Sequence, residues 1–142
     1  MMDQFSYSEI TDGDYEMARS WCEGHGRSFI SSEFLPATGF KIYCEEEPIV
    51  MLWMYFDNSC PVTFVEWVIS RPGLTPAQTS AALFYAIDTP VSRAMIFHGA
   101  KVACTRSPKA FVRYMVKKGW RIEDRELYSM VYVLREVEVF AV

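Results

Sequence analysis

The sequence has no long hydrophobic run. Its longest apolar segments, residues 49–56 and 81–87, are far below the ~20 residues that a membrane-spanning helix needs. The chain also begins without the charged and then apolar stretch of a secretory signal. We therefore expect no membrane span and a cytoplasmic location.

Basic charge is scarce. The chain has 14 Lys and Arg against 18 Asp and Glu, a formal net charge of -4, and its longest basic run is the pair Lys117 and Lys118. A general nucleic-acid surface needs a basic stripe that neutralises phosphates. We therefore expect no nucleic-acid partner.

Closely spaced metal-ligand pairs are also lacking. The four cysteines stand outside any C-x-x-C or C-x-x-H pattern, and the two histidines, His25 and His98, are isolated. This spacing predicts no metal site. It favours reduced thiols, which are typical of a cytoplasm, and we expect the thiol of Cys104 to be buried in a short strand.

The residues that are present can build a substantial core. Of 142 residues, 51% are hydrophobic and 15% are aromatic, which is typical of a globular chain. This length is ordinary for one compact domain, so we expect a single domain over residues 1–142. Its first strand falls within residues 1–10, and residues 136–142 form a tail or an added edge strand.

The first half of the chain alternates strand and helix patterns. We expect a strand near residues 5–9, a helix from a cap at residues 11–14 to about residue 23, a short helix at 30–35, a strand at 40–44, and two apolar central strands at 49–56 and 62–70 joined by a hairpin loop at 57–61.

The second half begins with a helix-start signal. Thr75-Pro76-Ala77-Gln78 has the capping-box spacing with proline at the first helical position, so a helix should begin at Thr75. Thr89-Pro90 either kinks this helix or caps a second segment. Next we expect a strand at 101–105 and a helix that is capped at Ser107-Pro108 and ends at Gly119. A hairpin of strands at 120–123 and 128–134 should follow.

This element order predicts the fold class. One strand–helix–strand crossover within a hairpin-linked sheet indicates an α+β fold. We expect a mixed, mostly antiparallel sheet of six to seven strands, flanked by helices in three layers.

Three segments carry a family resemblance. They are residues 64–70 followed by Pro72, residues 94–105, and residues 111–120 with their closing Lys117-Lys118-Gly119-Trp120. Their order resembles the core of the Gcn5-related N-acetyltransferase (GNAT) family, over roughly residues 5–134. The resemblance implies a fourth strand that diverges from the fifth, with acyl-coenzyme A in the gap and the backbone of Val68, Ile69 and Ser70 on its pantetheine arm.

The resemblance implies acetyl-coenzyme A as co-substrate and an amine as acceptor. In the family an Arg/Gln-x-x-Gly-x-Gly/Ala loop holds the pyrophosphate, whereas residues 74–81 of this chain contain no glycine. A helix N-terminus still offers amides and a positive dipole end, although Pro76 removes one amide. The candidates here are Thr75, Gln78, Thr79 and Ser80.

Two residues are candidates for the chemistry. Acetyl transfer to an amine needs a base and donors that stabilise an oxyanion. Glu66 is the only carboxylate in an apolar strand, where burial is costly without a task or partner; the alternatives are an edge position or an ion pair with Arg71 or Lys101. Tyr114 is the candidate acid. It stands one residue before the family's tyrosine position, and its alternative is a surface tyrosine.

An aromatic cluster allows two interpretations. Trp53, Tyr55, Phe56 and Trp67 lie on the two central strands. They line an acceptor pocket or, as aromatic residues of central strands usually do, form core.

The function hypotheses are therefore two. One is an acyl-coenzyme A-dependent N-acetyltransferase. The other is a catalytically inactive acetyltransferase-like module that binds a protein near residues 136–142; a homodimer is also open. The stretches at residues 35–39 and 69–73 are similar to small phage-encoded acetyltransferase-like proteins, which would place the chain in a host cytoplasm.

Overall fold

The computed structural model describes residues 4–106 and 109–123 and has a five-stranded mixed sheet. The strands follow one another in the order β1 (Phe5–Glu9), β2 (Thr38–Cys44), β3 (Glu47–Phe56), β4 (Val62–Ser70) and β5 (Val102–Thr105). The first four pair antiparallel, and β5 lies parallel to β4.

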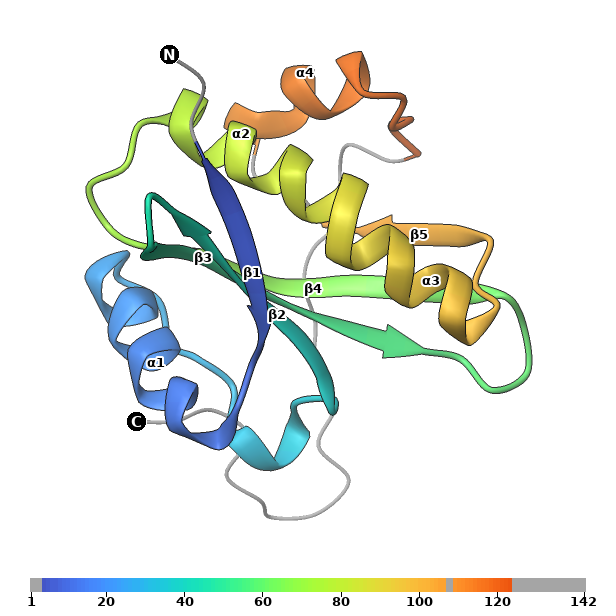
Figure 1. Cartoon of the computed structure of the whole chain (residues 1–142), viewed down its shortest axis with the longest axis horizontal. Helices are drawn as coiled ribbons and strands as arrows, with labels where there is room; N and C mark the ends of the chain where they lie inside the picture. The colour runs from blue at the N-terminus through green and yellow to red at the C-terminus, as the bar shows by residue number, and fades with distance from the viewer. Residues whose placement is uncertain (1–3, 107–108, 124–142) are drawn as a thin grey trace.

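Helices cover both faces of this sheet (Figure 1). The helix α1 (Tyr15–Gly24) packs on one face, and α2 (Pro76–Ala86) packs on the other, followed by the π-helical turn η3 (Ile87–Val91) and α3 (Ser92–His98). The last described helix, α4 (Lys109–Lys117), contacts α2. The expected α+β class and three layers are therefore confirmed.

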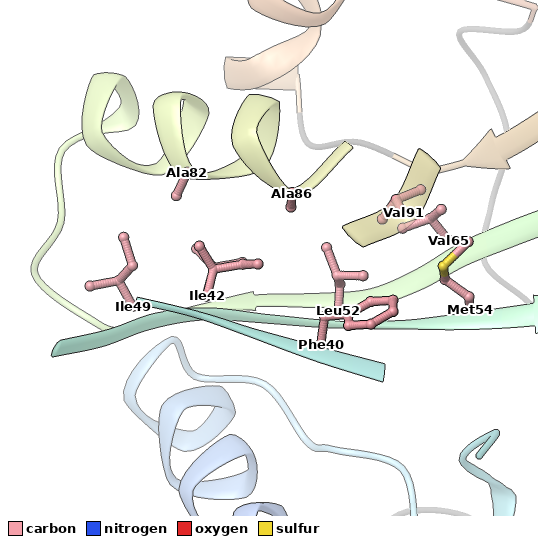
Figure 2. Close-up of a cluster of buried hydrophobic side chains, with 10 residues drawn as sticks. Phe40, Ile42, Ile49, Leu52, Met54, Val65, Ala82, Ala86 and Val91 are labelled. Carbon is pink, nitrogen blue, oxygen red and sulfur yellow. The ribbon is translucent and has the colours of Figure 1, made fainter. Parts of the chain in front are cut away.

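The apolar run of β3 reflects two cores. Val50, Leu52 and Met54 face the core beneath α2, whereas Met51 and Trp53 face the core beneath α1. Each of these five is at most 3% exposed. Figure 2 shows Ala82 and Ala86 of α2 pointing toward the side chains of the first core, with another helix beyond the strands. A strand with both faces covered needs apolar residues at successive positions.

Local signals set the element boundaries. Glu45 and Glu46 both have positive φ, 50° and 70°, as a two-residue hairpin turn requires. At α2, Gln78 N–H donates to Thr75 Oγ1 at 3.2 Å and Thr75 N–H donates to Gln78 Oε1 at 2.8 Å. The predicted helix start is therefore confirmed.

The chain stays helical through Pro90. This proline has no N–H and its ring would clash with the carbonyl one turn earlier, so the helix widens into the π turn η3. Ser92 supplies two donors to the Ile87 carbonyl, its backbone N–H and its Oγ at 2.5 Å. The kink alternative is the one found, and α3 ends at Gly99, which has φ 73°.

Several expectations differ from the structure. The short helix at 30–35 is only the 3-10 turn η2 (Ser32–Phe34), since so few residues cannot stabilise an α-helix. Cys104 is exposed, because β5 has one uncovered face within the described residues. Residues 120–123 form no strand, so the described sheet has five strands rather than six to seven. The expected strand at 128–134 and the segment 136–142 lie outside the described residues.

Candidate functional site

The strands β4 and β5 part halfway along β4. They pair from Val62 opposite Val102 to Val65 opposite Thr105, where β5 ends. The Thr105 hydroxyl donates to the Val65 carbonyl at 2.7 Å. Within the described residues no strand pairs with β4 beyond Val65 on the side away from β3. The pairing thus stops where β5 ends, and the divergence implied by the family resemblance stays a prediction.

A β-bulge follows directly. The pairing between β3 and β4 shifts register between Met51 and Trp53, so that Trp67 and Val68 together oppose Leu52. Trp67 has φ 56°, a left-handed conformation. A bulge leaves one residue unpaired and bends its strand, and a non-glycine residue in this region stores roughly 1–3 kcal/mol of strain. The bulge thus re-aims backbone groups at the parting of the strands.

Hydrogen bonds hold the bulged tryptophan. Its Nε1 donates to the Tyr55 hydroxyl at 3.0 Å, and that hydroxyl donates to the Phe34 carbonyl at 3.0 Å. Burial raises the pKa of Tyr55, and the nearby Glu66 carboxylate raises it further against the opposing effect of the Trp67 hydrogen bond. Tyr55 is therefore neutral at physiological pH and links the bulge to the segment before β2.

Glu66 lies at the parting, paired with an arginine from β5's end. Arg106 donates to Glu66 Oε2 from Nε at 3.1 Å and from Nη2 at 2.8 Å. The expected ion-pair alternative is thus correct in kind, but its partner is neither Arg71 nor Lys101. Nη1 of Arg71 instead lies 3.9 Å from Oε2 of Glu47.

The expected pantetheine-binding residues differ in their side chains. Val68 packs toward α2, Ile69 is buried beneath α1, and Ser70 is half-buried. Their shared feature is that no strand of the described residues pairs with them on the side away from β3. His25, just after α1, contacts the Ser70 carbonyl through Nε2 at 2.8 Å, which ties α1 to the end of β4.

In the turn that is expected to bind phosphate, the side chains hydrogen-bond largely within the turn. Thr75 and Gln78 hydrogen-bond one another. Pro76 has no N–H, so the Ala77 amide is the first N–H of this helix, and no capping partner for it is found among the described residues. Thr79 and Ser80 are buried. The Ser80 hydroxyl has no hydrogen-bond partner among the described residues, which is uncommon for a buried polar atom.

No contact among the described residues connects Tyr114 with Glu66. Its hydroxyl accepts a hydrogen bond from Arg113 Nη2 at 2.9 Å, and the guanidinium lies 4.8 Å from its ring centre. Its assignment as an acid stays a prediction.

The aromatic residues divide between the two interpretations. Trp53 is core at 3% exposed and lies 5.4 Å from the ring of Phe29. Tyr55 and Trp67 are half-buried beside Glu66 and the bulge. Phe56 stacks on His98 at 3.9 Å between ring centres. Only the pair Tyr55 and Trp67 therefore adjoins the candidate site.

Sequence reasoning missed Arg106 and the bulge. Arg106 had a usable signal, because it follows β5 as Glu66 follows the paired part of β4. The bulge had none, since a tryptophan does not predict positive φ. In the part of the chain that the structure describes, no group of three or more metal-ligating side chains is placed to hold a metal ion, and no helix has the length and apolar character to cross a membrane.

Comparisons with known proteins give a consistent fold. No protein-family model matches the chain, and no curated protein matches it. Solved structures do match. An acetyltransferase of Trypanosoma brucei has a TM-score of 0.57 at 13% identity, covering 90% of this chain and 100% of that one.

Two bacterial structures agree. A predicted acetyltransferase of Clostridium acetobutylicum, solved with acetyl-coenzyme A, has a TM-score of 0.55 at 11% identity, with 89% and 96% covered. A Gcn5-related N-acetyltransferase of Ralstonia eutropha has a TM-score of 0.56 at 11% identity, with 89% and 99% covered. These likenesses show that the chain has the acetyltransferase fold.

Proposed function

We propose that the protein is an N-acetyltransferase that moves the acetyl group of acetyl-coenzyme A to an amine. One observation carries this proposal: β4 and β5 part at Val65 and Thr105, directly beside a bulge and a carboxylate. Residues 66–70 pair with no described strand on the side away from β3, and such an edge suits an extended ligand that pairs with main-chain groups. The solved structures of this fold include one with acetyl-coenzyme A bound.

The residues at the parting fit the two needs of the reaction. An acceptor ammonium must lose a proton, and Glu66 is the carboxylate at this position. The thioester oxygen gains negative charge as the amine attacks, and a backbone N–H of the bulge at Trp67 and Val68 is the candidate donor to it. We propose that the backbone of Val68, Ile69 and Ser70 binds the pantetheine arm.

Phosphate binding is proposed for the start of α2. The Ala77 amide and the positive end of the helix dipole attract a phosphate, and the unpartnered Ser80 hydroxyl is a spare donor or acceptor nearby in sequence. Thr75 and Gln78 join only if their mutual hydrogen bonds open. We expect Thr79 to act with them, and Tyr114 to return the proton to the departing thiolate.

Calorimetry with acetyl-coenzyme A is the first test. We expect micromolar affinity, roughly -8 kcal/mol. Changing both Gln78 and Thr79 to alanine should weaken it if this turn binds phosphate. Undiminished affinity in the double variant would remove the turn from the site.

Turnover is tested with Glu66→Gln. The change keeps the shape of the side chain and removes the base, so thiol release should fall by a factor of about 10² or more while acetyl-coenzyme A still binds. Full activity in a folded variant would contradict the assignment of Glu66.

A second candidate function is a catalytically inactive module that binds a protein. Two observations favour it. The start of α2, where we propose phosphate binding, is capped by its own side chains. Ile96 and Phe97 are 81% and 85% exposed, as at docking sites. We expect the double change of Ile96 and Phe97 to serine to abolish capture of such a partner. Detectable acetyl-coenzyme A turnover would exclude this candidate.

A further inference from the structure

Glu66 and Arg106 occupy equivalent places on two neighbouring strands. Val65 pairs with Thr105 in the last rung between β4 and β5, and each charged residue follows its strand's member of that rung. Their ion pair therefore bridges the two strands at the point where the backbones separate.

The contact uses one carboxylate oxygen. Both Nε and Nη2 of Arg106 donate to Glu66 Oε2, and within the described residues Oε1 accepts no hydrogen bond. The Glu66 side chain is only 18% exposed, so its charge needs this partner. Arg106 thus holds one oxygen, and the other has no hydrogen-bond donor in the part of the chain that the structure describes.

The neighbouring hydroxyl groups of Thr105 and Tyr55 do not hold the Glu66 carboxylate, because each donates to a backbone carbonyl. The last rung is closed by the Thr105 hydroxyl on the Val65 carbonyl, and the Tyr55 hydroxyl donates to Phe34. Among the described residues, Arg106 is the side chain that orients the Glu66 carboxylate.

We propose that Arg106 is a positioning residue that fixes Glu66 through Oε2 so that Oε1 receives the proton of the acceptor ammonium. This inference rests on the proposed N-acetyltransferase function. An N–H bond of the ammonium breaks as an O–H bond forms at Oε1, and the nitrogen keeps the electron pair. That pair forms the new C–N bond, the thioester C–S bond breaks, the nitrogen loses a second proton, and the departing thiolate takes up one proton to become the thiol.

The test compares three arginine variants. Arg106→Gln removes the charge and the two-nitrogen contact, and Arg106→Lys restores the charge. The matched control is Arg19→Gln, because Arg19 also places Nε and Nη2 on one oxygen, Glu16 Oε2, at 3.0 and 2.9 Å. The assay is thiol release from acetyl-coenzyme A, with the fastest acceptor from a panel of primary amines, or with water where no amine exceeds hydrolysis.

The expected pattern separates positioning from binding. Arg106→Gln should lower kcat by about tenfold or more, within the range of general-base contributions, while the KM for acetyl-coenzyme A changes less than about twofold. Arg106→Lys should recover most of kcat, and Arg19→Gln should leave it unchanged. In the Glu66→Gln background, Arg106→Gln should lower kcat by less than about twofold, because the two residues act as a unit.

Two results would overturn the inference. One is a kcat for Arg106→Gln equal to that of Arg19→Gln, and the other is the same fold loss with and without the Glu66 carboxylate. In either case wild-type binding and turnover remain, so the proposed function stands. If wild-type protein fails to bind acetyl-coenzyme A in calorimetry, the proposed function falls and takes this inference with it.

Discussion

At the scale of single residues, a few largely buried charged side chains hold neighbouring elements together. Lys41 Nζ lies 2.5 Å from Asp14 Oδ1, with side-chain exposures of 15% and 11%. Asp14 Oδ2 also accepts the Thr11 N–H at 2.9 Å. Burial alone would raise the pKa of Asp14, but the hydrogen bonds from Lys41 and Thr11 and the lysine charge outweigh burial and lower it. This carboxylate fastens the start of α1 to β2.

Asp14→Asn should therefore destabilise the protein in a pH-dependent way. Removing one partner of a nearly buried pair leaves Lys41 uncompensated, so we expect the unfolding free energy to fall by about 3 kcal/mol at pH 7. A carboxyl group whose pKa is lower in the folded state than in the unfolded state stabilises the protein at pH values above its unfolded-state pKa. This contribution is lost as the pH falls through the folded-state pKa. The wild-type advantage should thus shrink below about pH 4.

Urea denaturation from pH 7 to pH 2 checks this expectation. Glu16→Gln is the control, because its pair with Arg19 is exposed and should contribute little. A deficit for Asp14→Asn that is constant with pH would show that lost packing, rather than charge, is responsible.

Elements meet closely at the site, where α1 touches the turn after β4. A Cβ atom on Gly24 would lie 2.5 Å from Cγ of Pro72. His25 follows at once and contacts the Ser70 carbonyl. The end of α1 therefore supports the end of β4 through a contact that only glycine permits.

Gly24→Ala tests that support. Overpacking of this kind costs about 1–3 kcal/mol, and we expect a loss of that size in urea denaturation. Gly13→Ala is the control, since its nearest non-neighbouring atom would be 3.8 Å away. Equal stability of the two variants would mean that Pro72 moves aside freely.

Most elements were predictable because their signals are local. The apolar runs of β3 and β4, the capping box of α2 and the glycine after α3 each depend on adjacent residues. The partner of Glu66 was not predicted, because Arg106 lies 40 residues away and reaches it only through the parallel register of β4 and β5. The bulge at Trp67 depends on packing and hydrogen bonds across strands, which no local pattern encodes.

At the scale of the whole molecule, the sheet separates two cores, and no strand of the described residues pairs with β4 beyond Val65 on the side away from β3. The acetyltransferase fold predicted from the family resemblance is confirmed, whereas its acetyl-coenzyme A site and the similarity to phage-encoded proteins stay predictions. The proposed acetyl-coenzyme A site lies between β4 and β5, which belong to one sheet. A ligand bound there would therefore link both halves of the molecule.

Ligand binding should therefore raise the melting temperature. At about 100 times Kd a ligand that binds only the folded state adds about 2.7 kcal/mol, which for a chain of this size corresponds to roughly 5–10 °C. Thermal denaturation followed by circular dichroism, with and without acetyl-coenzyme A, measures the shift. Acetate at the same concentration is the control, and an unchanged melting temperature at millimolar acetyl-coenzyme A would contradict the proposed site.

The π turn at Pro90 has a consequence for how this chain tolerates length changes. Ala82, Ala86 and Val91 all face the same core, although the second interval is five residues rather than four. The wide turn absorbs the additional residue and resets the angular phase of α3. Deleting the exposed Asp88 would shorten the interval between Ala86 and Val91 to four residues, which an ordinary helical turn spans, so α3 should keep its phase and His98 its contact with Phe56. A single-codon deletion should thus be tolerated in this turn, whereas the same deletion within α2 or α3 would rotate the residues that follow by about 100°.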